Sequence, residues 1–206
     1  MQSFETLEEE KRQRILNAAM HEFAEKGFAQ ASTNAIVKQA NIGKGMLFYY
    51  FNNKQTLFNY LVGYALTVVD EQFMQKIDMN NRDFIDRLYD AAKKKLACYH
   101  AYPHVFTFLT TVILKETALL DEDLQQRIVA LQHDGERKLY ENIDTTLFRD
   151  GIDVDKALQL IKWAFEGYQQ HLIQTMETEV ITTIDFDPYW KEFEEYLAVL
   201  KTCFYA

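Results

Sequence analysis

The chain has 206 residues, 48% of them apolar, which is enough for a sizeable core and excludes a chain that is disordered throughout. The formal net charge is −9, and no run of about twenty apolar residues occurs, so we expect no membrane-spanning helix. Only two prolines and seven glycines are present, and the long stretches without them favour a mostly helical protein.

The charge is distributed unevenly along the chain. Residues 11–60 carry seven Lys/Arg and two acidic residues, whereas residues 61–206 carry fifteen basic and twenty-five acidic ones. An acidic surface that only aids solubility would explain the second segment but not the reversal in the first. A basic segment of this kind can bind phosphate groups.

Two further features bear on the compartment. Cys98 and Cys203 show no metal or redox spacing, and free thiols are typical of a reducing cytosol. The N-terminus lacks the charge and apolar order of a signal peptide. We therefore expect a cytoplasmic protein, and we predict neither a metal nor a cofactor. His100 and His104 have helical i, i+4 spacing, but a third ligand is missing.

The first predicted helix spans roughly residues 8–26. Ile15, Ala19 and Phe23 recur at helical spacing and form one apolar stripe. Gly27 follows and suits a left-handed position at the end of the helix.

Two very short helices are predicted next, over about 33–40 and 44–51. Ser32 or Thr33 can cap the first, and Asn41–Gly43 is the turn between them. A helix of two turns is not stable alone in water, so a scaffold must hold it against something.

A longer helix is predicted over residues 54–77, with Asn52 or Asn53 as its N-cap. Further helices are predicted to begin at Asn81, His104, Asp121, Asp153 and Asp187, and to end near Pro103, Lys115, Phe148, Glu177 and Phe204. The β-branched segment Val180–Ile184 is a loop or a short extended piece. The expected fold class is all-α, with about nine helices.

The segment Phe48–Phe51 is aromatic throughout and, taken alone, would suit the core of an ordinary helical bundle. Its neighbours favour a different interpretation, because Lys44-Gly45 precedes it, Lys54 follows it, and the surrounding charge is basic.

The combined pattern resembles the tetracycline-repressor (TetR) family of bacterial regulators. It consists of Lys26-Gly27-Phe28, Ile36-Val37-x-x-Ala40, Lys44-Gly45-x-Leu47-Phe48-x-x-Phe51 and Lys54-x-x-Leu57. Four positions depart from the common family pattern: Asn41 replaces Gly, Gly43 replaces Ser, Phe48 replaces Tyr, and Tyr50 replaces His. The resemblance implies a three-helix helix-turn-helix head.

Within this head, Lys44 and Gly45 would face base edges in the major groove, and Met46 and Tyr49 would point towards the groove or its wall. Phosphate contacts are expected from Thr33, Tyr50 and Lys54. The full set of predicted DNA-binding residues is Thr33, Asn34, Lys44, Gly45, Met46, Phe48, Tyr49, Tyr50 and Lys54.

The resemblance also implies a head over residues 1–52 and a ligand-sensing, dimerising body over 53–206, with helix 53–78 connecting them. The predicted dimer interface consists of Phe165, Tyr168, Leu172, Trp190, Phe193, Leu197 and Leu200. A thicker core within one chain is the alternative, because the helix from Asp153 has apolar residues on two faces and either face could form the seam.

The predicted ligand-binding residues combine aromatic rings with a few polar groups: Tyr89, Phe106, Phe108, Trp163, Glu166 and His171. They suggest a small lipophilic effector, aromatic or cationic, although a fatty acyl ligand fits about as well.

The expected function is a homodimeric repressor that binds a palindromic double-stranded operator, with heads about 34–36 Å apart, and is released by its effector. The alternative is an all-helical carrier of hydrophobic ligands without DNA binding. No catalytic constellation occurs, so we do not expect an enzyme.

Overall fold

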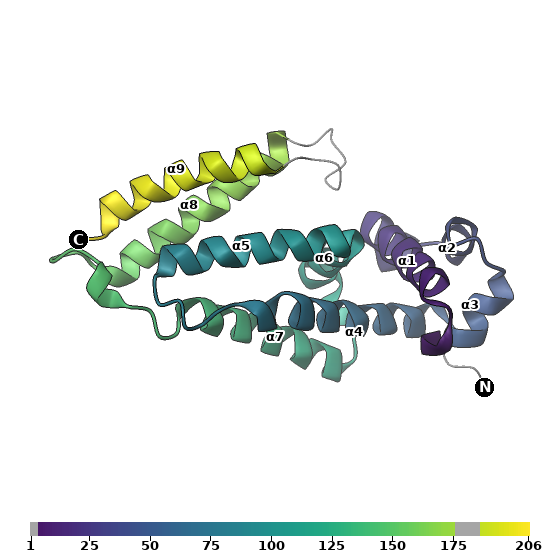
Figure 1. The fold of residues 1–206 in the computed structure, drawn as a ribbon. Coiled ribbons are helices and arrows are strands. Elements are labelled where there is room, and N and C mark those ends of the chain that lie inside the picture. The colour runs from purple at the N-terminus through teal and green to yellow at the C-terminus, as the bar shows by residue number, and fades with distance from the viewer. Residues whose placement is uncertain (1–3, 176–185) are drawn as a thin grey trace. The chain divides into compact units, whose positions relative to one another are not determined.

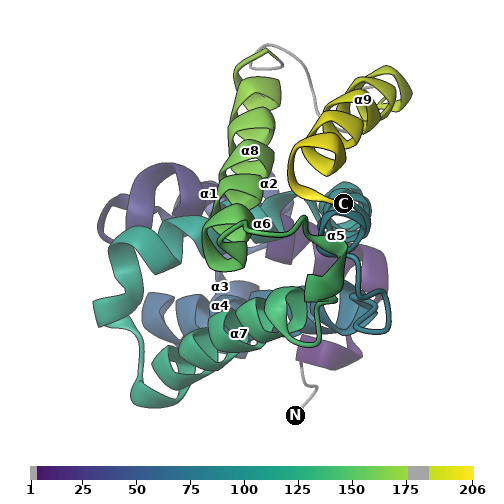
Figure 2. The same ribbon diagram turned by 90° about the vertical axis from the view of Figure 1, so that its left-hand side faces the viewer.

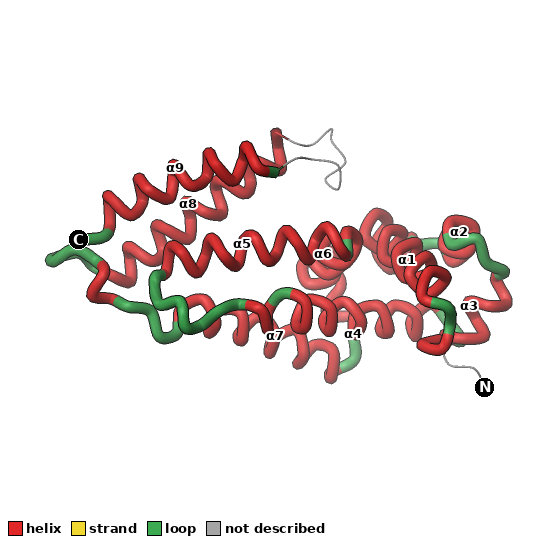
Figure 3. The backbone as a smooth tube through the Cα atoms, in the orientation of Figure 1, coloured by secondary structure: helices red, strands yellow, loops and turns green. Residues whose placement is uncertain are grey.

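The structure, a computed structural model, describes residues 4–175 and 186–206. Within these ranges it contains nine α-helices and no β-strand, which confirms the predicted fold class (Figures 1 and 3). The helices are α1 (Glu9–Gln30), α2 (Thr33–Gln39), α3 (Lys44–Phe51), α4 (Lys54–Gln72), α5 (Phe84–Ala101), α6 (Pro103–Thr111), α7 (Glu122–Tyr140), α8 (Val154–Thr175) and α9 (Asp187–Phe204). Five short segments accompany them: the 3₁₀ turns η1 (Phe4–Thr6), η2 (Met74–Lys76), η4 (Thr117–Leu119) and η5 (Thr145–Leu147), and the π-helix η3 (Val112–Glu116).

None of the helices in the described ranges is long and apolar enough to cross a membrane. The segment Val180–Ile184 lies outside the described residues.

Several helix starts follow from side-chain caps that the sequence predicts. The side chain of Ser32 accepts the backbone N–H of Ala35, Asn53 that of Thr56, Asp121 that of Leu124, and Asp153 that of Lys156. These bonds satisfy N–H groups that have no partner within the helix. Helix α9 begins at Asp187, as predicted, but Phe186 and not Asp187 occupies the N-cap position.

Other predicted boundaries were wrong for local reasons. Asp83, not Asn81, caps α5, because the Asp83 carboxylate accepts the Asp86 N–H at 3.1 Å. The helix predicted over 121–148 ends at Tyr140, and Asn142 then adopts a left-handed φ of 61°. A polar Asn tolerates this conformation and turns the chain.

The chain forms two compact units. Unit 1 comprises residues 1–76 and 97–135, and unit 2 comprises residues 77–96 and 136–206. Unit 1 thus contains the predicted head together with α4, α6 and most of α7. The predicted division at residue 52 concerns function and stays a prediction.

The core of unit 1 is aromatic. Phe23 of α1, Phe58 of α4 and Phe108 of α6 meet with ring centroids 5.0 Å (Phe23–Phe58), 5.7 Å (Phe58–Phe108) and 6.3 Å (Phe23–Phe108) apart. Phe28 packs on Phe58 from the end of α1, at 5.0 Å. Since all three helices share this cluster, α1 is fixed against both α4 and α6.

Unit 2 packs the start of α5 against α8 and α9, which lie next to each other in both views (Figures 1 and 2). Its buried side chains are Phe84, Ile85, Leu88, Phe148, Ala157, Ile161, Phe193 and Leu197. The stacked rings of Tyr168 and Phe193, 4.5 Å apart, join α8 to α9.

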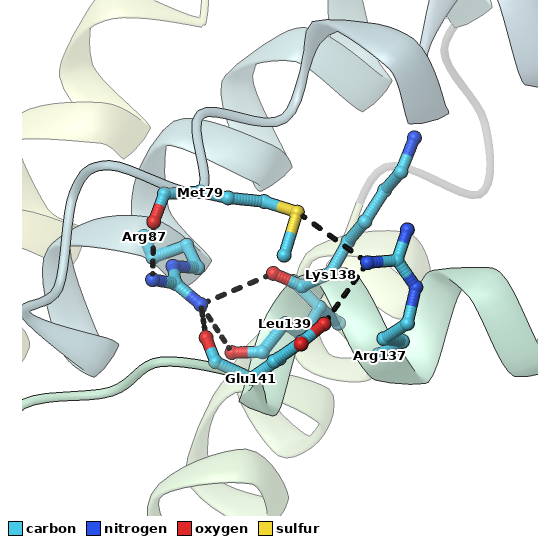
Figure 4. Close-up of polar contacts among 6 residues, drawn as sticks. All are labelled: Met79, Arg87, Arg137, Lys138, Leu139 and Glu141. Carbon is cyan, nitrogen blue, oxygen red and sulfur yellow. Dashed lines mark hydrogen bonds and ion pairs between the residues drawn. The ribbon is translucent and has the colours of Figure 1, made fainter.

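Arg87 of α5 is the only buried polar or charged side chain among the residues described. Its guanidinium donates to the carbonyls of Lys138, Leu139 and Glu141 at the end of α7 and to that of Met79, at 2.6–3.3 Å (Figure 4). It also donates to the Asn81 carbonyl at 2.7 Å. A cation is favourable at a helix C-terminus, and here it also satisfies carbonyls that the ended helix leaves open.

Candidate nucleic-acid interface

Helices α2 and α3 form a helix-turn-helix whose turn agrees with the sequence prediction. Asn41 has a left-handed φ of 53°, and the Ile42 N–H donates to the Val37 carbonyl at 3.0 Å. Asn tolerates this region, so the turn forms without the glycine that is usual there.

The inner face of α3 is anchored by its apolar residues. Leu47 and Phe51 are buried, and the ring of Phe51 lies 4.8 Å from that of Phe4. Phe4 itself is buried in η1 and also contacts Tyr50 and Tyr60. Sequence reasoning missed this contribution, although Phe4 is the only aromatic residue among the first twenty.

The outer face of α3 is open. Lys44 and Gly45 are exposed, and the Tyr49 side chain is 48% exposed. No atom lies within 4 Å of the position that a Cβ would take on Gly45. The helix therefore presents an ammonium group, bare backbone and a phenol to its surroundings.

The other predicted DNA contacts vary in their access. Asn34 is exposed and Thr33 is half-buried at the start of α2. Met46, Phe48 and Tyr50 are also half-buried, and the Phe48 ring lies 5.9 Å from the Lys44 ammonium.

Lys54 has a different role from the predicted phosphate contact. Its ammonium group donates to the carbonyls of Phe28, Ala29 and Ala31 at 2.8, 3.3 and 3.2 Å, and lies over the Phe28 ring. The three donor positions of Lys54 are thus used within the protein, at the end of α1. This contact joins residues more than twenty positions apart, which no local pattern reveals.

The predicted ligand-binding residues are divided between the two units. Phe108 is fully buried in the aromatic core of unit 1, and Phe106 of the same unit stacks on Tyr99. The other four belong to unit 2, where Trp163, Glu166 and His171 are exposed on α8 and Tyr89 packs against Trp190. The predicted pocket of rings and a carboxylate stays a prediction.

Burial shifts the pKa of several titratable side chains, among them Lys95 and His104. Burial lowers the pKa of Lys95 on α5, which has no hydrogen bond or ion pair within the described ranges. Burial, and then the nearby His21, lower the pKa of His104, whose ring lies 5.5 Å from that of His21. Across the described residues, no three or more His, Cys, Asp or Glu side chains are grouped to bind a metal ion.

The predicted dimer residues are mostly engaged within the chain. Phe193 and Leu197 are buried in unit 2, and Phe165, Tyr168, Leu172, Trp190 and Leu200 are half-buried. The exposed apolar residues of α8 and α9 lie on other faces of these helices: Leu160, Trp163, Tyr196 and Val199. The buried pair thus belongs to the chain's own core.

A short helix that is exposed on one side and anchored on the other by a helix-turn-helix is typical of DNA-binding proteins that read the major groove.

Comparisons with known proteins also indicate a DNA-binding protein. Residues 15–61 match the family described as "Bacterial regulatory proteins, tetR family". The fatty acid metabolism regulator protein of Bacillus subtilis strain 168 is 26% identical over 155 residues, covering 71% of this chain and 75% of that protein.

A further relative, an uncharacterised HTH-type transcriptional regulator from Lactococcus lactis, is 26% identical over 147 residues, which cover 64% of this chain and 67% of that protein. The fold matches a solved TetR-family regulator from Chloroflexus aurantiacus with a TM-score of 0.66 and 19% identity, over 98% of this chain and 97% of that one. Residues 15–61 thus match the DNA-binding segment of TetR-family regulators, and the chain is similar to transcriptional regulators of this family.

Proposed function

We propose that the protein is a cytoplasmic, ligand-responsive repressor that binds a palindromic operator as a homodimer and is released by a small lipophilic effector. The open outer face of α3 carries this proposal, because Lys44 and Gly45 are exposed at the start of an anchored helix. In this position a lysine can donate to guanine O6 and N7. Met46 and Tyr49 complete the face towards the groove.

We assign phosphate contacts to Thr33, Asn34 and Tyr50. Lys54 is left out because its ammonium group donates to three backbone carbonyls. Thr33 and Asn34 lie at the N-terminus of α2, where backbone N–H groups attract anions. Tyr50 can donate its hydroxyl to a phosphate. These contacts fix the register of the head on the duplex, whereas α3 reads the bases.

The test is selection of duplexes from genomic DNA by the purified protein, followed by titration of the recovered operator. Lys44→Ala should weaken operator binding by about tenfold and relax the base preference at one position, because one base contact is lost. Lys191→Ala removes the same charge from an exposed position on α9 and should bind like the wild type. Equal affinities for the two variants would contradict the assignment of α3.

We infer the dimer surface from the exposed apolar stripe on α8 and α9. Leu160, Trp163 and Gly167 share one face of α8, and no atom lies within 4 Å of the Cβ position of Gly167. Tyr196 and Val199 are the exposed apolar residues of α9. Two such helix pairs can form a four-helix seam, in which a glycine permits close approach of the helices.

The effector is proposed to be a long-chain fatty acid or a related acyl compound. The name of the Bacillus subtilis relative supports this class. Lys95 of α5 also supports this class. It lies on the same face of the helix as the buried residues Leu88 and Ala91, and it has no acidic partner among the residues described. A half-buried ammonium group without an acidic partner favours an anionic ligand, whereas the carboxylate of Glu166, which suggested a cationic one, is exposed.

The effector proposal is tested by release of operator DNA. Palmitic acid should release the wild-type protein, and the cationic lipophile decyltrimethylammonium should not. Lys95→Met should lower the response to palmitic acid by about tenfold, because the charge that attracts the carboxylate is lost, while Lys94→Met should respond like the wild type. Release by the cation alone would reverse the assignment.

A further inference from the structure

The backbone at the end of α1, residues 27–31, is held by two side chains that come from outside the helix-turn-helix. The Glu116 carboxylate accepts the Phe28 N–H at 3.1 Å. The Lys54 ammonium donates to the Phe28 carbonyl at 2.8 Å and to the carbonyls of Ala29 and Ala31. Both polar groups of the Phe28 backbone therefore bond to side chains, one of them 88 positions away in the sequence.

Gly27 makes the contact with Glu116 possible. Its φ of +68° is unfavourable for any residue with a side chain. In addition, a Cβ at this position would lie 2.8 Å from the Glu116 carboxylate oxygen, closer than real Cβ contacts come. The glycine thus serves two purposes, since it breaks α1 and lets the carboxylate reach the backbone.

Glu116 is placed by an unusual backbone. It is the last residue of the π-helix η3, which continues α6 directly. The Thr117 hydroxyl shares its one hydrogen between two carbonyls of this turn, at 3.2 Å from Val112 and 3.1 Å from Ile113. Single π turns are rare and occur frequently at functional sites.

The held segment leads directly into the DNA-binding helices. Ala31, whose carbonyl Lys54 binds, precedes Ser32, the N-cap of α2. The position of α2 therefore depends on Lys54 and, through Phe28, on Glu116. Because η3 continues α6, a shift of α6 would move the Glu116 carboxylate and, through its hydrogen bond to Phe28, the backbone of residues 27–31.

We propose that Glu116 is a positioning residue for operator binding: with Lys54 it fixes the Gly27–Ala31 segment, and it makes operator affinity depend on the end of α6. This inference rests on the proposed function. It predicts that removal of the Glu116 negative charge weakens specific DNA binding. Electrostatics alone predicts the opposite, because loss of a negative charge reduces repulsion from the phosphates.

The experiment compares three variants of the full chain on the operator recovered by the wild-type protein. Glu116→Ala removes the acceptor for the Phe28 N–H, and Glu116→Gln keeps an acceptor oxygen but not the charge. Glu122→Ala removes the same charge from an exposed position on α7 of the same unit. Operator affinity, affinity for a scrambled duplex and the salt dependence of both are measured, and amide hydrogen exchange at Phe28 is followed by NMR.

Glu116→Ala should bind the operator about tenfold more weakly, as expected for the loss of a hydrogen bond to a charged group, with unchanged salt dependence and unchanged scrambled-duplex affinity. The Phe28 amide should exchange faster, and Glu116→Gln should restore both properties to within about threefold. Glu116→Ala binding as tightly as Glu122→Ala would overturn the inference. Failure of the wild-type protein to select any duplex would overturn the proposed function instead.

Discussion

Gly45 allows the DNA-binding role of α3 to be tested separately from its stability. It is exposed inside a helix, and a methyl group there would meet no protein atom within 4 Å. Gly45→Ala should therefore stabilise the protein by about 0.5–1 kcal/mol, since alanine has the higher helix propensity. In the proposed complex, the same methyl group would stand between the backbone and the base edges.

We expect Gly45→Ala to bind the operator at least about tenfold more weakly while it unfolds at a higher urea concentration. Urea unfolding followed by circular dichroism and fluorescence anisotropy of a labelled operator measure the two effects. A variant that is both more stable and equally tight in DNA binding would mean that Gly45 does not face the duplex.

The sequence predicted the parts of the site that depend on neighbours along the chain. The exposed positions of Lys44, Gly45 and Tyr49 follow from the short helix and its apolar anchors. The role of Lys54 does not, because its three carbonyl partners are brought near only by the packing of α1 on α4.

At the scale of elements, α1 meets α6 through a pair of histidines as well as through the aromatic core. His104 is half-buried, and burial followed by the neighbouring His21 lowers its pKa. In the unfolded chain this side chain takes up a proton near pH 6.5, whereas the folded protein does so only at lower pH. Between these two pKa values the unfolded state binds more protons, so the free energy of unfolding falls as the pH falls.

Replacement of His104 by glutamine should therefore flatten the loss of stability between pH 7.5 and about pH 5.5. Urea unfolding at several pH values gives the slope, and His133→Gln, at an exposed position on α7, provides the matched control. If both variants kept the slope of the wild type, protonation of His104 would not oppose folding.

Helix boundaries were predictable where a capping side chain fixes them. Ser32, Asn53, Asp121 and Asp153 each accept an N–H close in sequence. The end of α7 was not predictable, because Arg87, from another helix, binds the final carbonyls. A pattern read along one segment contains no information on such a distant partner.

At the scale of the whole molecule, dimerisation decides how strongly a palindromic site is bound. Two heads joined in one dimer bind the two half-sites with a high effective concentration, whereas separate monomers bind each half-site alone. The surface proposed for this contact centres on Trp163, which is 59% exposed on α8. Exposed large apolar residues that share a helix face are typical of a protein–protein interface.

Trp163→Glu should convert the dimer to a monomer, because a carboxylate in an apolar seam would be buried without a partner. Gln169→Glu adds the same charge on the opposite side of α8, at an exposed position, and should stay dimeric. Sedimentation velocity distinguishes the two states. Because the head is unaltered, Trp163→Glu should bind an isolated half-site like the wild type and lose affinity only for the complete palindrome, by about a hundredfold. A dimeric Trp163→Glu would require that the seam use another face of α8 or α9.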